Sequence, residues 1–71
     1  MDRSIDYVIA VAECKSISQA AEMLYISQPS LSRYLSNLEN ELGVNLFVRT
    51  LNGTELTAAG KIYLEYAIYS K

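Results

Sequence analysis

The sequence predicts a single, mainly α-helical domain in which three helices are followed by a small β-hairpin and a further helix. Three observations predict this class: apolar residues recur at helical spacing in separate stretches, serine or threonine precedes several of those stretches, and one Asn-Gly pair interrupts the pattern. A chain of 71 residues that is 51% hydrophobic and 20% charged suffices for one folded domain and is too apolar for a disordered tail.

The first two helices are expected over roughly residues 4–14 and 17–24. In the first, the i, i+3, i+4, i+7 spacing is formed by Ile5, Val8, Ile9 and Ala12. A capping box follows, with Ser16 at the N-cap and Gln19 three positions later. The second helix carries the adjacent alanines of Ala20–Ala21, which allow a neighbouring helix to approach closely.

The third helix is expected to begin near Gln28, because Ser27 can cap it and Pro29 suits the first turn, where a backbone N–H is not needed. It should end at Gly43, since glycine tolerates the left-handed conformation. Its apolar stripe is formed by Leu31, Leu35, Leu38 and Leu42.

After this helix the period changes, and residues 47–50 and 54–56 are predicted to be short strands around Asn52-Gly53, a strong hairpin signal. Thr57 can cap a last helix, which has no stop signal of its own. We therefore expect a winged helix-turn-helix domain over residues 1–56 and the truncated start of a linker helix over residues 57–71.

This last helix is expected to have two apolar sides, one packed on the domain and one on a partner. The aliphatic side consists of Leu64, Ala67 and Ile68. The aromatic side, to which we assign dimerisation, consists of Ile62, Tyr63, Tyr66 and Tyr69. A tyrosine side that only covers the core of the domain is the alternative interpretation.

The amino end of the third helix is small, polar and uncharged except for Arg33. At roughly 100° per residue, Arg33 lies about 200° around the helix from Leu31 and should point away from the core. A helix that enters the DNA major groove reads bases from its N-terminal residues and needs slim side chains there. The pattern therefore indicates a DNA-reading helix, in which Gln28 pairs with adenine, Arg33 binds guanine or phosphate, and the serines donate to phosphate.

The stretch SISQAAEMLYISQPSLSRYLSNLENELGVNLFVRT, followed by LTAAG, resembles the DNA-binding domain of the LysR-type transcriptional regulators. This family resemblance implies a winged helix-turn-helix and a long helix after the wing that pairs two subunits. It further implies a homodimer or higher oligomer on double-stranded DNA with an inverted-repeat operator. A C-terminal domain that binds a small-molecule effector is expected outside these 71 residues.

Carried over by position, the resemblance places DNA contacts on the second helix, the third helix and the segment before the wing. These contacts are Ser18, Gln28, Pro29, Ser30, Ser32, Arg33, Arg49 and Thr50. Gln28 and Arg33 are the expected base readers. Phosphate is assigned mainly to Ser18, Ser32, Arg49 and Thr50, and an architectural role to Glu39.

The chain departs from the family pattern in two places. Tyr34 stands where the family usually has glutamine, and it can either bind the DNA backbone or complete the hydrophobic edge. The wing, read as Leu51 to Glu55, lacks the usual basic residues. With six basic against eight acidic residues and a net charge of −2, we expect weak binding by a monomer.

Other classes of function fit less well. No histidine, metal-ligand spacing or glycine-rich phosphate loop is present, so we expect neither an enzyme nor a cofactor. A winged-helix protein-interaction module that has lost most DNA affinity is the alternative, against which Gln28, Ser32 and Arg33 argue. An apolar run of membrane-spanning length and a signal peptide are both lacking, and Cys14 is the single cysteine; we expect a cytoplasmic protein with Cys14 as a small hydrophobe.

Overall fold

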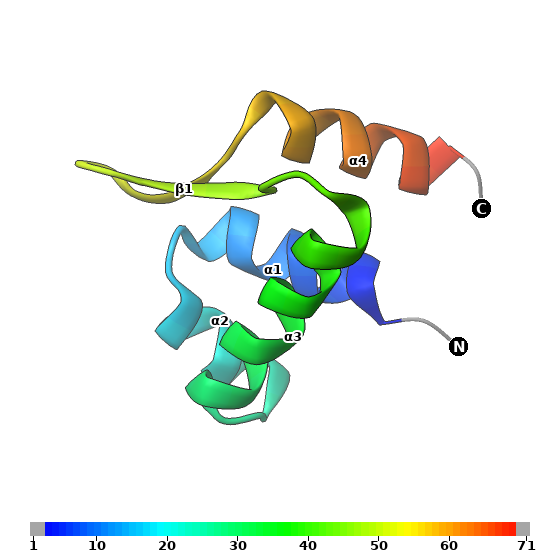
Figure 1. Ribbon diagram of the computed structural model, residues 1–71. Helices are drawn as coiled ribbons and strands as arrows, with labels where there is room; N and C mark the ends of the chain where they lie inside the picture. Colours follow the sequence, from blue (N-terminus) through cyan, green and yellow to red (C-terminus); the bar gives the residue numbers. More distant parts are fainter. Residues whose placement is uncertain (1–2, 70–71) are drawn as a thin grey trace.

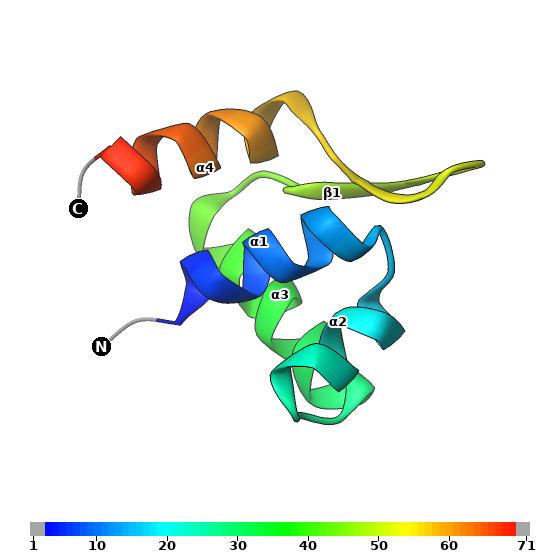
Figure 2. The ribbon, with the colours of Figure 1, turned by 180° about the vertical axis from the view of Figure 1, so that it is seen from behind.

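The computed structural model describes residues 3–69 and contains the expected helices and hairpin (Figure 1). In chain order the elements are α1 (Ser4–Cys14), α2 (Ile17–Leu24), α3 (Gln28–Leu42), β1 (Phe47–Thr50), β2 (Gly53–Leu56) and α4 (Ala58–Tyr69). Figures 1 and 2 show α1 in the middle, with the hairpin and α4 on one side and α2 with α3 on the other. The predicted fold class is confirmed.

The core lies around α1, which contacts α2, α3, α4 and β2. Its fully buried side chains include Val8, Val11, Ala20, Leu31 and Leu46. The buried face of α1 differs from the predicted stripe, because Ser4, Val8 and Val11 face inward while Ile5, Ile9 and Ala12 are half-buried. Burial of Ser4 is possible because its hydroxyl shares a hydrogen bond of 2.8 Å with the Tyr63 hydroxyl on α4.

Side-chain caps begin three helices where the sequence predicts them. The Ser16 hydroxyl accepts the Gln19 N–H at 3.1 Å, the Ser27 hydroxyl accepts the Ser30 N–H at 3.2 Å, and the Thr57 hydroxyl accepts the Gly60 N–H at 2.9 Å. Each bond satisfies one of the backbone donors that a helix start leaves without an intrahelical partner.

The helices α1, α2 and α3 each end at a residue with left-handed backbone conformation, and only one of these residues is glycine. Gly43 closes α3 with φ 75°, as predicted. Lys15 closes α1 with φ 55° and Tyr25 closes α2 with φ 59°. A residue other than glycine, asparagine or aspartate is strained by roughly 1–2 kcal/mol in the left-handed backbone conformation. The residue types at these two positions do not predict that conformation.

The hairpin turn differs from the prediction by one position. Thr50 pairs with Gly53, so the two residues of the loop are Leu51 and Asn52, and Gly53 is the first residue of β2. Gly53 has φ 115°, and a Cβ there would lie 2.5 Å from the Lys15 carbonyl oxygen. Because that oxygen also accepts the Thr54 N–H at 3.0 Å, the approach of α1 decides where the glycine falls.

The apolar stripe of α3 leaves the core before its end. Leu31 and Leu35 are buried and Leu38 is half-buried, but Leu42 is 43% exposed. Leu42 lines an open apolar groove together with Val44, Leu46, Ala59, Ile62, Tyr63 and Tyr66. The end of α3 therefore faces α4 across this groove and is not covered by α1.

Candidate nucleic-acid interface

The residues that begin α3 are exposed. Ser27 caps it from outside the helix, and its hydroxyl also donates to the Ser30 hydroxyl at 2.8 Å. Gln28, Pro29 and Ser30 are exposed, so this end of the helix presents slim polar groups around backbone N–H donors. Such an end attracts an anion without any formal charge of its own.

Arg33 lies one turn further along α3 and is exposed, as its angular distance from Leu31 predicts. Within residues 3–69 no hydrogen bond or ion pair engages its guanidinium. The group keeps all its donors for a ligand, and its planar fork suits either a guanine edge or a phosphate.

Ser18 lies at the start of α2 and contacts the same end of α3. Its hydroxyl donates to the Gln28 side-chain oxygen at 2.8 Å, although the two residues are ten positions apart. The packing of α2 on α3 thus brings together two residues that the sequence places in separate helices. No local pattern predicts this pair.

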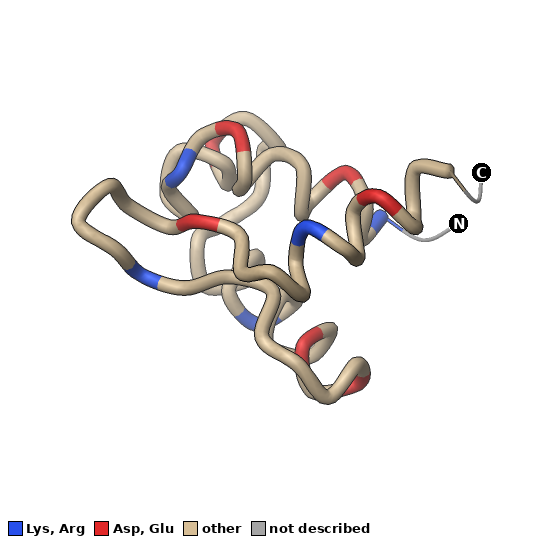
Figure 3. Tube along the Cα trace, turned by 90° about the horizontal axis from the view of Figure 1, so that it is seen from above, with Lys and Arg blue, Asp and Glu red and all other residues tan. Residues whose placement is uncertain are grey.

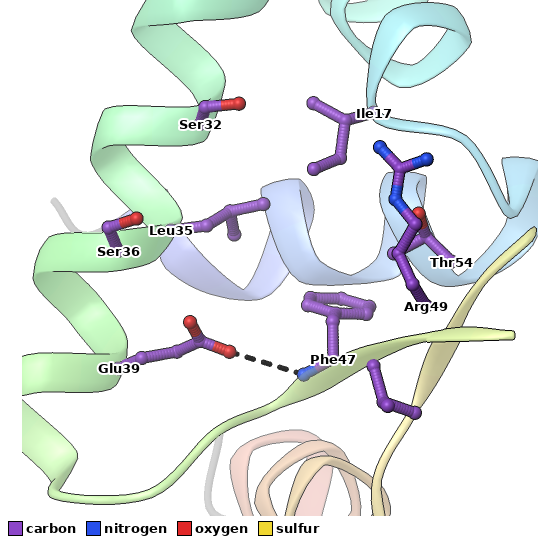
Figure 4. A pocket seen from close by; sticks show the side chains of 9 residues that line it. Ile17, Ser32, Leu35, Ser36, Glu39, Phe47, Arg49 and Thr54 are labelled. Carbon is purple, nitrogen blue, oxygen red and sulfur yellow. Dashed lines mark hydrogen bonds between the residues drawn. The ribbon is translucent and has the colours of Figure 1, made fainter.

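A hollow of about 210 Å³ separates α3 from the hairpin and the start of α2. Figure 4 shows Ser32 and Ser36 on α3, Ile17 on α2 and Arg49 on β1 around this hollow, with the Arg49 guanidinium directed toward α2. Ser32 is half-buried and Arg49 is exposed. The structure therefore brings Ser32 and Arg49 to one hollow, and it adds Ser36, which was not among the predicted site residues.

Glu39 places the hairpin relative to α3. Its carboxylate accepts the backbone N–H groups of Leu46 at 2.6 Å and Phe47 at 3.2 Å, the second of which is drawn in Figure 4. Leu46 is fully buried and Phe47 begins β1. The carboxylate therefore joins the middle of α3 to the first residue of β1, in line with an architectural role.

Thr50 lies on the opposite face of the hairpin from Arg49, because successive residues of a strand point to opposite faces. Its hydroxyl donates to the Glu55 carboxylate at 2.8 Å, and the Gly53 carbonyl oxygen lies at 3.3 Å as a second, more distant acceptor. These bonds direct the hydroxyl proton into the wing. Arg49 and Thr50 therefore do not face one ligand together.

The same hydrogen bond affects the acidic residue of the wing. The Thr50 hydroxyl, and after it the Asn52 side chain, lowers the pKa of Glu55, with smaller contributions from the charges of Lys15 and Lys61. The Glu55 residue is only partly exposed in the hairpin. Glu55 therefore presents a stable negative charge on the wing near neutral pH.

Charge is not gathered on one surface. Figure 3 shows basic and acidic residues interspersed along the chain. On the hairpin, Arg49 lies in β1 and Glu55 in β2, and residues 51–53 between them are uncharged. Basic residues are therefore not clustered along the described part of the chain. Recognition by this domain has to rest on individual groups such as Arg33 and Arg49 rather than on a broad field.

Tyr34 is half-buried and its ring lies toward α1. Its ring meets the ring of Tyr7 on α1, with centroids 4.7 Å apart and an interplanar angle of 67°. Edge-to-face aromatic pairs of this kind stabilise packing. Of the two interpretations of Tyr34, the structure supports completion of the hydrophobic edge.

The structure divides the aromatic residues of α4 differently from the prediction. Ile62, Tyr66 and Tyr69 are 66%, 75% and 87% exposed. Tyr63 packs against the core, and its hydroxyl binds Ser4. At roughly 100° per residue, the angle around the helix from Tyr63 to the buried Ala67 is smaller than the angle from Tyr63 to Tyr66. Tyr63 therefore does not share the outer side on which the sequence placed it. It also lines the groove beside Ile62.

A three-helix core that exposes the amino end of its third helix beside a short hairpin defines a winged helix-turn-helix domain. Comparison with known proteins narrows this class. Residues 3–61 match the family described as bacterial regulatory helix-turn-helix protein, lysR family, and the chain belongs to this family.

Curated relatives are considerably longer than this chain. It is 48% identical over 65 residues to the HTH-type transcriptional regulator TfdT of Cupriavidus pinatubonensis. The matched region covers 92% of this chain and 28% of TfdT. This chain is 54% identical over 65 residues to the HTH-type transcriptional regulator ClcR of Pseudomonas putida, with 92% and 22% covered. The chain therefore spans about a quarter of the length of these regulators.

Two solved structures share the fold closely. The complex of the CbnR DBD with DNA superposes with a TM-score of 0.85 at 46% identity, covering 97% of this chain and 80% of that one. The complex of the BenM DBD with catB site 1 DNA has a TM-score of 0.86 at 41% identity, covering 97% and 75%. Both are DNA complexes of LysR-family regulators.

Neither a membrane-spanning helix nor a metal-binding cluster occurs among the described residues. No helix among residues 3–69 is long and apolar enough to cross a bilayer. The same part of the chain holds no cluster of three or more histidine, cysteine or acidic side chains arranged for a metal ion.

Proposed function

We propose that this domain binds double-stranded DNA sequence-specifically as the N-terminal part of a bacterial transcriptional regulator of the LysR family. The observation that carries the proposal is the exposed, capped end of α3, where Gln28, Ser30 and Arg33 stand free of the core. The DNA complexes of CbnR and BenM support it. The alternative of a protein-interaction module has no support among these relatives.

In this proposal α3 enters the major groove, and its side chains divide the work of recognition. Gln28 and Arg33 read base edges, because they are exposed and carry the groups that pair with purines. Pro29 and Ser30 allow the helix backbone to come close to the DNA. Ser32 and Arg49 hold phosphate from the two sides of the hollow between α3 and the hairpin.

Hydrogen bonds within the domain engage the two other predicted contacts, Thr50 and Ser18. Thr50 reaches a phosphate only if its hydroxyl proton turns away from Glu55. Ser18 already donates its proton to Gln28. We propose residues 1–56 as the DNA-binding unit and α4 as the start of a dimerisation helix that uses Ile62, Tyr66, Tyr69 and the exposed part of Tyr63.

This chain corresponds to about a quarter of the length of its curated relatives, and we extend the proposal to the longer protein. A homodimer or higher oligomer on an inverted repeat follows from the two-fold symmetry that such operators share with their proteins. A small-molecule effector would act on a domain outside these 71 residues. The relatives are transcriptional regulators, and we propose that this protein too is not an enzyme.

Selection from a pool of random duplexes tests the proposal directly. The 71-residue domain is incubated with the pool at low and at physiological salt, and the bound duplexes are sequenced. We expect a short motif repeated with inverted symmetry to be enriched at both salt concentrations. Binding that enriches no motif, or that disappears completely at physiological salt, would contradict a sequence-specific reader.

A further inference from the structure

We propose that Ser18 is a positioning residue that fixes the orientation of the Gln28 side chain and thereby sharpens the base selectivity of Gln28. The inference rests on the proposed DNA-binding function and adds a specific role within it. It replaces the assignment of Ser18 to phosphate by an action through another side chain.

The geometry of the pair supports this role. The Ser18 hydroxyl donates to the Gln28 side-chain oxygen at 2.8 Å, which is the usual length of a strong O–H···O hydrogen bond. A serine has one hydroxyl proton. While that proton is hydrogen-bonded to Gln28, the Ser18 hydroxyl cannot donate to a phosphate.

The chemistry of an amide explains why its orientation matters. One end of the Gln28 amide accepts hydrogen bonds and the other end donates two, so a 180° turn of the group exchanges what it offers to a base edge. In the structure the oxygen end faces the Ser18 hydroxyl on α2, which leaves the donor end of the amide toward a base edge. The amide then presents one arrangement of donor and acceptor, and a base pair that needs the opposite arrangement is disfavoured.

Both residues sit on rigid supports, so the orientation exists before DNA arrives. Ser18 is the second residue of α2 and Gln28 the first residue of α3. Each helix start is held by its own cap, from Ser16 and from Ser27. Ordering a long exposed side chain in advance removes part of the entropy cost of binding.

The test combines base selection with a double-mutant cycle. The variants are Ser18→Ala, Ser18→Thr, Gln28→Ala and the double Ser18→Ala, Gln28→Ala, with Gln19→Ala as the matched control for loss of a neighbouring exposed polar side chain. Unfolding midpoints establish that each variant folds. Ser18 is exposed and is not the helix cap, so we expect Ser18→Ala to leave the midpoint unchanged.

In DNA binding we expect Ser18→Ala to reduce the preference for the favoured base at one position by about three- to tenfold, while binding to unrelated DNA stays the same. Ser18→Thr keeps the hydroxyl and should keep the preference. In the Gln28→Ala background the further loss of Ser18 should have no effect. An undiminished effect in that background would show that Ser18 binds DNA itself and would overturn the proposal, as would unchanged selectivity of Ser18→Ala.

A second measurement needs no DNA and separates this inference from the function on which it rests. The heteronuclear NOE of the Gln28 side-chain amide should show an ordered group in the wild type and in Ser18→Thr, and a mobile one in Ser18→Ala. A mobile amide in the wild type would overturn the positioning role even if the domain binds DNA. An ordered amide in a domain that selects no DNA sequence would instead contradict the proposed function, and the selectivity role with it.

Discussion

Arg33 gives the clearest test at the scale of single residues, because its guanidinium is exposed and engages nothing else in the described structure. We expect Arg33→Ala to weaken specific binding by about 1–3 kcal/mol and to relax the sequence preference at one base position. Quantitative binding to the selected motif and to its single-base variants measures both effects.

Arg49→Ala serves as the comparison for Arg33, since Arg49 is assigned to phosphate from its place beside the hollow. This variant should weaken binding to all sequences alike and reduce the salt dependence by about one unit of slope. If Arg33→Ala behaves in the same uniform way, Arg33 is a phosphate contact and not a base reader.

Tyr25 offers a prediction about stability at the same scale. It adopts φ 59° with its side chain 95% exposed, so the side chain contributes strain and almost no packing. Tyr25→Gly should relieve that strain and, after the extra chain entropy of glycine, stabilise the domain by up to about 1 kcal/mol. Thermal unfolding should show a higher midpoint.

The matched control for Tyr25 is Glu22→Gly, an exposed position inside α2 with ordinary helical backbone. There glycine should destabilise by about 1 kcal/mol. A lower midpoint for both variants would mean that Tyr25 is not strained in solution.

Among the elements, the connection between α3 and β1 depends on one carboxylate. Glu39→Ala would leave the N–H groups of Leu46 and Phe47 without their acceptor, and hydrogen bonds to charged groups are worth about 1.5–3 kcal/mol. We expect a loss of roughly that size in urea unfolding and faster hydrogen exchange at the two amides. Glu39→Gln keeps a neutral acceptor and should cost less.

Glu41→Gln controls for the loss of an acidic residue from the same helix, because Glu41 is exposed. It should leave the urea midpoint nearly unchanged. Equal effects of Glu39→Ala and Glu41→Gln would remove the architectural role of Glu39.

The wing gives a prediction about pH. The pKa of Glu55 is lowered in the folded domain from its ordinary value of 4.5, first by the Thr50 hydroxyl and then by Asn52. A lowered folded pKa means that the stabilising contribution is present above the unfolded value and is lost as the pH falls through the folded value. Glu55→Gln should therefore be less stable than the wild type at pH 7, and the difference should shrink as the pH falls below the ordinary value of 4.5. A difference that does not change with pH would contradict the interaction.

How far the elements could be predicted depends on the range of the interactions that form them. The caps at Ser16, Ser27 and Thr57 use atoms three residues apart, so they can be read from local spacing. The exposure of Arg33 follows from the angle between residues of one helix.

The features that the sequence did not predict arise between elements. Gly53 lies against the carbonyl of Lys15, the residue that closes α1, and the inner face of α1 includes Ser4 because Tyr63 on α4 binds it. The pairing of Ser18 with Gln28 requires the packing of α2 on α3. No spacing within a single helix contains this information.

At the scale of the whole molecule, both the net charge and the exposed apolar surface favour pairing of two domains on DNA. A domain with a net charge of −2 gains little from non-specific attraction to DNA. The outer face of α4 exposes Ile62, Tyr66 and Tyr69, and the neighbouring groove adds Leu42 and Val44. Pairing of two domains through this face would bury apolar surface and double the number of DNA contacts.

This pairing can be tested on DNA that carries one or two half-sites. We expect the wild-type domain to bind two half-sites cooperatively, and the double variant Ile62→Ser, Tyr66→Ser to bind each half-site independently with unchanged affinity for one. Tyr63→Phe is the control, because it removes the hydroxyl that binds Ser4 while keeping the ring on the core; it should reduce stability and leave cooperativity intact. Loss of cooperativity in Tyr63→Phe alone would place the contact between domains on the inner side of α4, and equal cooperativity in all three proteins would exclude α4 from pairing.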